Sequence, residues 1–268
     1  MPFIIMLASS IAIIALVKYG LVPGIDRVSS ALGWSLKARG KATGYATSVP
    51  ELVTLVAAGL SGVWDVGLWN IASSNMINLI LATAALLYFR RGKDLMDRRF
   101  VQELSFAGLG ILAPIFLMKA GLDTHWLVIP ILLSLFIVYL MLDRGDGELP
   151  EGQAGHEGEG LWAGLAAMGL SLVAIILAGD FLGQSTKNVV QVMGVPAMVA
   201  GWVLGLVTSL PEAVTFFTVF SDRREAGCSD HKAQIQELLD NLAASNMSNS
   251  ALIYPVGLLI YLLGIGLI

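Results

Sequence analysis

The sequence predicts an all-α membrane protein, a polytopic bundle of about eight spanning helices built as an inverted-topology repeat. Three observations predict this fold. The 268 residues are 56% hydrophobic and only 13% charged, whereas about a quarter of a soluble domain is charged. The apolar residues form long continuous runs, and two polar motifs occur once in each half of the chain. Cys228 is the only cysteine and the net charge is −4, which argues against a disulfide-rich scaffold and against a nucleic-acid partner.

Eight apolar runs are long enough to cross the hydrocarbon core, which takes about 20 helical residues. The first run lacks a preceding basic segment and an evident cleavage site, so we interpret it as a retained span rather than a signal peptide. The last run is long, and Pro255 is expected to bend it. The predicted spans are 3–23, 42–63, 67–89, 102–119, 126–142, 161–182, 196–220 and 238–266.

The basic residues predict the orientation of these spans. The segments that follow the first, third, fifth and seventh spans carry every Lys and Arg except Lys119 and Lys187, with Lys18 counted at the end of the first span. Because Lys and Arg concentrate in cytoplasmic loops, we expect the N-terminus outside a cell (inner) membrane. The Gly-rich, acidic segment 143–160 is then a cytoplasmic linker between a first membrane half, 1–142, and a second half, 161–268.

Two motifs recur in the same order. The first motif, GYATSVPELVT at 44–54, matches GLVTSLPEAVT at 205–215 in seven of eleven positions. The second motif, NIASSNMIN at 70–78, matches NLAASNMSN at 241–249 in six of nine positions. The copies lie five predicted spans apart, so they cross the membrane in opposite directions. An inverted repeat of this kind places a binding site near the bilayer midplane and suits alternating access.

Glu51 and Glu212 occupy the same position in the two copies of the first motif. Ionisable residues inside membrane spans are costly and usually functional, so these two carboxyls are the first candidates. Asp65, Asp180 and Asp240 lie near the ends of predicted spans, where we expect them to reach the interface.

Polar residues accompany each glutamate at matched spacings. Thr47 and Thr208 lie one turn before Glu51 and Glu212, on the same helix face. Pro50 and Pro211 each remove a backbone donor and are expected to kink the helix. The second motif adds two pairs at a four-residue spacing, Ser74 with Asn78 and Ser245 with Asn249.

All these candidate ligands are oxygen donors. The absence of His and Cys among them argues against zinc and copper, and oxygen ligands suit Ca²⁺, Na⁺ and, less well, Mg²⁺. Two carboxylates neutralise one divalent ion, and they are too costly to leave bare in a low-dielectric site. The sequence therefore predicts exchange of one cation for other cations or protons, with inorganic cations and the lipid bilayer as partners, no cofactor and no enzyme activity.

The paired motifs resemble the two inverted α-repeats of the cation/calcium exchanger superfamily, which includes sodium/calcium and proton/calcium exchangers. The resemblance implies a Ca²⁺ antiporter driven by Na⁺ or H⁺, with Glu51 and Glu212 as central ligands. It implies further ligands from hydroxyls, kinked backbone and amides, at Thr47, Ser48, Thr208, Ser209, Ser74, Asn78, Ser245 and Asn249.

Two features depart from that family. Its members commonly have ten spans, so a face is expected to be left uncovered here, and a homo-oligomer would cover it. Some members carry Asp at the position of Asn249, which lowers the charge of this site. The alternatives to a calcium antiporter are a cation channel or passive pore, an exchanger for another cation such as Mg²⁺, and a membrane scaffold that has lost transport.

Overall fold

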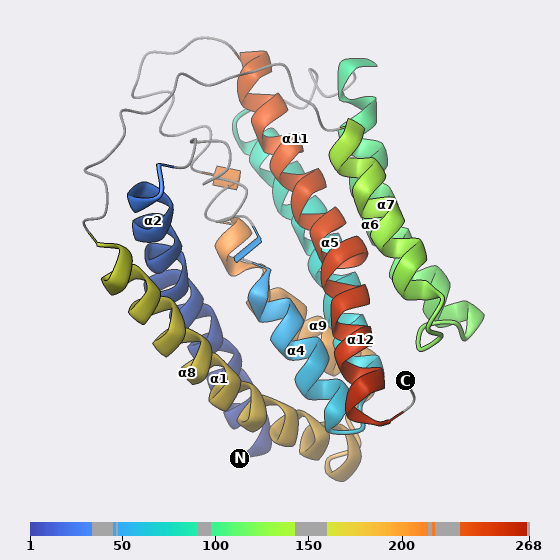
Figure 1. Ribbon diagram of the computed structural model, residues 1–268. Helices are drawn as coiled ribbons and strands as arrows, with labels where there is room; N and C mark the ends of the chain where they lie inside the picture. The colour runs from blue at the N-terminus through green and yellow to red at the C-terminus, as the bar shows by residue number, and fades with distance from the viewer. Residues whose placement is uncertain are drawn as a thin grey trace.

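The computed structural model describes residues 1–33, 45–46, 48–90, 98–142, 160–213, 216–217 and 231–266. Within these ranges the chain is a helical bundle without strands (Figure 1). Of the predicted linker 143–160, only Gly160 belongs to the described residues. The elements are α1 (Pro2–Leu16), η1 (Val17–Leu21), α2 (Val22–Ala31), α4 (Val49–Leu60), α5 (Trp64–Tyr88), η3 (Arg98–Phe100), α6 (Val101–Ala120), α7 (Val128–Leu142), α8 (Leu161–Lys187), η4 (Asn188–Val192), α9 (Ala197–Thr208), α11 (His231–Ser248), η5 (Asn249–Ile253) and α12 (Tyr254–Gly264).

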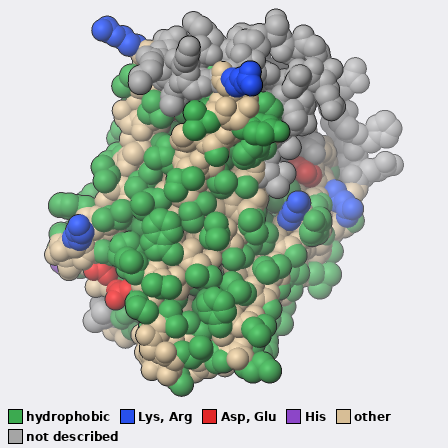
Figure 2. Space-filling model, turned by 180° about the vertical axis from the view of Figure 1, so that it is seen from behind, with side chains coloured by type: hydrophobic (Ala, Val, Ile, Leu, Met, Phe, Trp, Pro, Cys, Tyr) green, Lys and Arg blue, Asp and Glu red, His purple; other side chains and the backbone are tan. Residues whose placement is uncertain are grey.

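These helices account for the eight predicted spans. Five helical runs are long and apolar enough to cross a membrane, namely Pro2–Ala31, Trp64–Tyr88, Val101–Ala120, Leu161–Val192 and Leu238–Gly264. The other three predicted spans correspond to the shorter apolar helices α4, α7 and α9. Hydrophobic side chains cover the middle and the lower part of the face in Figure 2, and the charged side chains lie at its top and at its left and right margins. The protein is therefore a multi-pass membrane protein.

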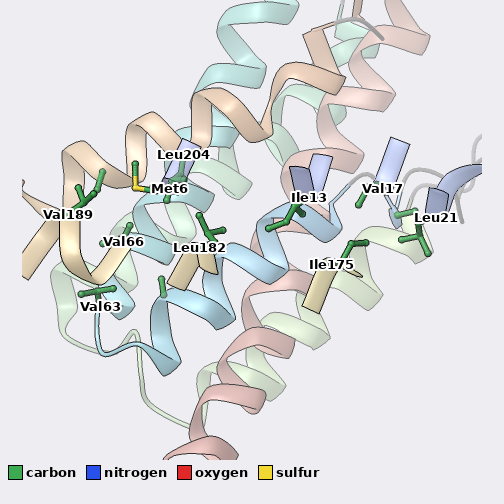
Figure 3. Close-up of a cluster of buried hydrophobic side chains, with 13 residues drawn as sticks. Met6, Ile13, Val17, Leu21, Val63, Val66, Ile175, Leu182, Val189 and Leu204 are labelled. Carbon is green, nitrogen blue, oxygen red and sulfur yellow. The ribbon is translucent and has the colours of Figure 1, made fainter. Parts of the chain in front are cut away.

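One side of the bundle is formed by α1, η1 and α2 packed along α8 (Figure 1). The helices touch closely at Gly24 and Gly164, where an added Cβ on Gly24 would lie 3.1 Å from the Gly164 carbonyl oxygen. Small residues let membrane helices approach in this way. Farther along, Met6, Ile13 and Ile175 belong to one apolar cluster that continues toward α5 and α9 (Figure 3).

The other side of the bundle is formed by α6 and α7, which pack against α5, α11 and α12 (Figure 1). The loop between α6 and α7 is tied to α12, because the Tyr254 hydroxyl donates a hydrogen bond to the Asp123 carbonyl oxygen at 2.8 Å. The Trp64 ring stacks on Tyr261 beside this contact, with centroids 4.6 Å apart. The two repeats are thereby enclosed between the α1–α8 side and the α6–α7 side.

Asp123, in the loop between α6 and α7, is expected to make the stability of the fold depend on pH. Partial burial, assisted by the charge of Asp65, raises the pKa of the Asp123 carboxyl above its ordinary value. A carboxyl whose pKa is higher in the folded state than in the unfolded state costs stability once pH rises through the folded-state value, and costs nothing below the unfolded-state value. We therefore expect Asp123→Asn to raise the thermal unfolding midpoint relative to wild type at about pH 7 and to converge with wild type near about pH 3. A difference that is constant with pH in detergent-solubilised protein would contradict this.

Candidate functional site

The two copies of the first motif interrupt their helices at the same serine. Ser48 precedes α4 with φ −87° and ψ 0°, and Ser209 follows α9 with φ −84° and ψ 2°. Each break lies two residues before the prolines, Pro50 and Pro211, that the sequence predicts as kinks. A proline has no N–H to bond the carbonyl four residues earlier in the chain. The helix therefore loses a hydrogen bond in the turn before the proline, and this is where it breaks. Broken helices at membrane depth are tolerated where protein buries them or where they line a cavity.

Glu51 and Glu212 both follow these breaks and both are buried, with 1% and 8% of their surface exposed. The Ser74 hydroxyl donates to Glu51 Oε1 at 3.4 Å. Glu212 interacts with the hydroxyl of Ser245, the residue that matches Ser74 in the other repeat. The two carboxylates lie near enough for their charges to interact. The structure therefore brings the two predicted central acids together, each with the serine of the neighbouring second motif.

Close packing of α9 on α5 joins the two repeats at this point. A Cβ on Gly205 would lie 3.0 Å from the Asn70 carbonyl oxygen and 3.0 Å from the Ser74 amide nitrogen. This contact between backbones places the Thr208 and Ser74 hydroxyls within hydrogen-bond distance, 3.0 Å apart. Thr208 also donates to Asn70 Oδ1 at 3.3 Å. The Thr208 hydroxyl of the second repeat thus bonds the serine that donates to Glu51 in the first repeat.

The asparagines of the second motif are tied through their nitrogens. Asn78 Nδ2 donates to Ser245 Oγ at 3.0 Å, and Asn249 Nδ2 donates to Asn75 Oδ1 at 2.9 Å. Their side-chain oxygens have no hydrogen-bond partner although both are buried. Glu51 Oε2 and Glu212 Oε2 are buried and unpartnered as well. Four oxygens from two matched pairs of residues are therefore free to accept a ligand.

This set of oxygens suits a hard cation. Buried acceptors in folded proteins are almost always satisfied, so these four oxygens call for a partner, which can be a cation or a proton donor. Carboxylate, amide and hydroxyl oxygens are the ligands that Ca²⁺ takes, usually six to eight at a time. Among the described residues no group of three or more His, Cys, Asp or Glu could hold a metal ion. A divalent ion here would rely on two carboxylates and on neutral oxygens.

The remaining predicted site residues have different placements. Ser209 is buried, and its hydroxyl donates to the Ser74 carbonyl oxygen at 3.4 Å. Ser48 is buried at the start of α4. Thr47 lies outside the described residues. Thr54 is an additional candidate, since its buried hydroxyl oxygen has no partner and it lies one turn after Glu51 on the same helix face.

Asn75 and Asn246 lie on a different helix face from the candidate ligands, where the sequence predicts that they cap freed backbone groups or join helices, and in the structure they join helices. Asn75 Nδ2 donates to the Gly110 carbonyl oxygen at 2.9 Å and to Ser250 Oγ at 2.8 Å. Asn246, its counterpart, donates to the carbonyl oxygens of Asn75 and Ala107, each at 3.2 Å. These amides fasten α5 and α11 to α6. Their matched positions and their helix face are the signals in the sequence, and the sequence does not name their partners on α6.

The two second motifs, both within the described residues, differ in their backbone at Asn249. The first repeat runs as regular α-helix through Asn78, whereas Asn249 begins the π-turn η5, in which the Tyr254 N–H bonds the Asn249 carbonyl. Pro255 follows directly and has no N–H for the carbonyl of Ala251, while the aligned residue in the first repeat is Ala84. The bend expected from Pro255 therefore takes the form of a wide turn beside a candidate ligand, where π-turns often occur.

Comparison with known protein families gives one match. The family described as sodium/calcium exchanger protein matches residues 2–143 and 163–265. No curated protein and no solved structure matches the chain. Because the family match covers nearly the whole chain and agrees with the paired motifs, this protein belongs to the sodium/calcium exchanger family, a family of membrane antiporters that transport cations including calcium.

Proposed function

We propose that this protein exchanges Ca²⁺ for Na⁺ or H⁺ by alternating access, at a site formed by the first and second motifs of both halves. The observation that carries the proposal is the set of four buried, unpartnered oxygens on Glu51, Glu212, Asn78 and Asn249. Thr47, Ser48, Thr208, Ser209, Ser74 and Ser245 complete the proposed ligand set, through hydroxyls or through the backbone at the helix breaks.

The two glutamates make the transport an obligatory exchange. One Ca²⁺ neutralises both carboxylates. After Ca²⁺ leaves, two bare carboxylates would remain side by side in a buried site, and this is expensive. Reorientation of the empty site is therefore slow, and it becomes fast when Na⁺ ions or protons replace the lost charge. The neutral oxygens of the hydroxyls and amides can bind Na⁺, and the carboxylates can accept H⁺.

We place the N-terminus outside the cell membrane and the linker 143–160 in the cytoplasm, because the basic segments then lie inside. The motifs of the membrane halves 1–142 and 161–268 cross the bilayer in opposite directions. If the two halves exchange conformations, an outward-open state therefore becomes an inward-open one. In this orientation an inward Na⁺ or H⁺ gradient drives calcium export.

Uptake of ⁴⁵Ca²⁺ into proteoliposomes tests the proposal and identifies the coupling ion. Vesicles loaded with Na⁺ at equal pH, and vesicles with an imposed pH gradient but no Na⁺, are measured separately. We expect one of the two gradients to drive uptake, and unlabelled Ca²⁺ inside the vesicles to accelerate it. Uptake that follows membrane potential alone, without stimulation from the opposite side, would show a channel instead. Competition by Mg²⁺ tests the choice of cation.

The asparagine oxygens can be tested individually. Asn78→Ala and Asn249→Ala each remove one neutral ligand and keep both carboxylates, so we expect the KM for Ca²⁺ to rise about tenfold with exchange still measurable. Thr83→Ala is a matched control on α5, since its exposed hydroxyl only donates to the Leu79 carbonyl. An unchanged KM in both asparagine variants would remove these residues from the site.

A further inference from the structure

Asn70 lies on α5, one turn before Ser74, and the proposed ligand set does not include it. Its side chain is fully buried, with 0% of its surface exposed, and its Oδ1 accepts a hydrogen bond from the Thr208 hydroxyl at 3.3 Å. Its Nδ2 is buried and has no hydrogen-bond partner among the described residues. A buried amide that is satisfied on one side only costs free energy. The bond to Thr208 therefore points to the role of this side chain.

The Thr208 hydroxyl has one proton and two lone pairs, so the acceptor of that proton decides which part of the oxygen faces the site. Thr208 Oγ1 lies 3.0 Å from Ser74 Oγ and 3.3 Å from Asn70 Oδ1. The Gly205 carbonyl oxygen, in the same helix as Thr208, is 3.4 Å away, and the Glu51 carboxylate is also within reach. If the proton points to Ser74 or Glu51, a cation in the site meets the proton instead of a lone pair.

The Gly205 carbonyl oxygen has other donors to serve. It already accepts the Ser209 N–H at 3.0 Å, and the Ser74 hydroxyl is a further donor to it at 3.4 Å. Asn70 Oδ1, in contrast, accepts from no other group in the part of the chain that the structure describes. Asn70 therefore gives the Thr208 proton an acceptor of its own, outside the set of oxygens that we propose as cation ligands.

We propose that Asn70 is a positioning residue for the ligand Thr208: its Oδ1 takes the Thr208 proton, so that the lone pairs of Thr208 remain for the transported cation. Partners of this kind orient the ligands of metal sites, and their loss typically lowers metal affinity about 10–100-fold. The bond joins α5 of the first repeat to α9 of the second, so a ligand from one repeat is oriented by an amide from the other. This inference rests on the proposed exchange function, because it concerns the same site.

Exchange of ⁴⁵Ca²⁺ in proteoliposomes, with KM and kcat measured separately, tests this role. Asn70→Leu keeps the approximate size of the side chain and removes the acceptor, so we expect the KM for Ca²⁺ to rise about tenfold, with a smaller change in kcat. Asn70→Asp keeps an oxygen for the Thr208 proton whether the carboxyl is protonated or ionised. We therefore expect the KM of Asn70→Asp to stay within about threefold of wild type. An unchanged KM in Asn70→Leu, or equal KM values in the two variants, overturns the proposal.

A double-mutant cycle with Thr208→Val separates positioning from packing. Valine has the shape of threonine without its hydroxyl, so Asn70→Leu should raise the KM no further in this background. Additive effects would show that Asn70 acts independently of Thr208, and they overturn the proposal. Equilibrium binding of ⁴⁵Ca²⁺ to the purified protein gives the same cycle if Thr208→Val transports too slowly to measure. If Asn70→Leu does not fold, Asn70→Ala takes its place in the cycle.

Ser73→Ala is the matched control for a lost contact between α5 and α9. The Ser73 hydroxyl is buried and donates to the carbonyl oxygen of Asn70 at 3.1 Å or of Gly201, on α9, at 3.2 Å, so it joins the same helices without bonding a proposed ligand. We expect Ser73→Ala to lower the thermal unfolding midpoint and to leave the KM for Ca²⁺ within about twofold of wild type. A rise in KM as large as that of Asn70→Leu would assign the effect to packing and overturn the proposal. Wild type that exchanges no Ca²⁺ would refute the proposed function itself, whereas failure of the cycle with active wild type refutes only the role of Asn70.

Discussion

Replacing Glu51 or Glu212 by glutamine is expected to abolish calcium exchange, with a loss of at least about 100-fold, because affinity for Ca²⁺ follows the number of charged ligands. Glutamine keeps the size of the side chain and one oxygen, and it removes one of the two charges that neutralise a divalent ion. Because each carboxylate is served by its own serine, Glu51 by Ser74 and Glu212 by Ser245, we expect the two variants to be impaired alike.

Exchange of ⁴⁵Ca²⁺ in proteoliposomes measures this loss. Asp65→Asn is the matched control, since Asp65 is an exposed acid in the first turn of α5 and its removal should leave exchange within about twofold of wild type. Thermal unfolding should be preserved in both glutamine variants, because an unpaired buried charge is removed rather than added. Exchange that survives in either Glu51→Gln or Glu212→Gln would refute the assignment of a two-carboxylate site.

Gly205→Ala is expected to impair both the fold and the site. The new Cβ would meet the Asn70 carbonyl oxygen and the Ser74 amide nitrogen at 3.0 Å. These are backbone atoms of α5, so they cannot turn away as a flexible side chain can, and α9 must separate from α5. Overpacking of this kind costs about 1–3 kcal/mol. Separation also moves the Thr208 hydroxyl away from Ser74 and Glu51, so exchange should fall together with stability.

Gly108→Ala is the control for Gly205→Ala. Gly108 lies on α6 with no atom within 4 Å of an added Cβ, and alanine favours a helix by up to about 1 kcal/mol over glycine. The thermal unfolding midpoint of Gly108→Ala should therefore equal or exceed that of wild type. If Gly205→Ala unfolds at the same temperature as Gly108→Ala and exchanges calcium normally, the close contact between α9 and α5 is not required.

The sequence predicts the features that depend on local chemistry. Runs of apolar residues locate the spans, and the repeated Pro-Glu pairs locate the two buried acids, because each signal lies within a few consecutive residues. The positions of the helix breaks are harder to predict, since Pro50 lacks the N–H donor but the helix is interrupted two residues earlier, at Ser48. Only the relative positions of helices decide the partners of Asn75 and Asn246, which bond residues of α6 far away in sequence.

The wide turn at Asn249 has a consequence for the direction of transport. Two halves with identical geometry would leave the empty carrier equally stable facing either side of the membrane. Here one half has a π-turn at its asparagine and the other has a regular helix, so we expect the two resting orientations of the proposed exchanger to differ in free energy. We expect the unloaded carrier to favour one side even without any gradient, and its forward and reverse rates to be unequal at matched ion concentrations.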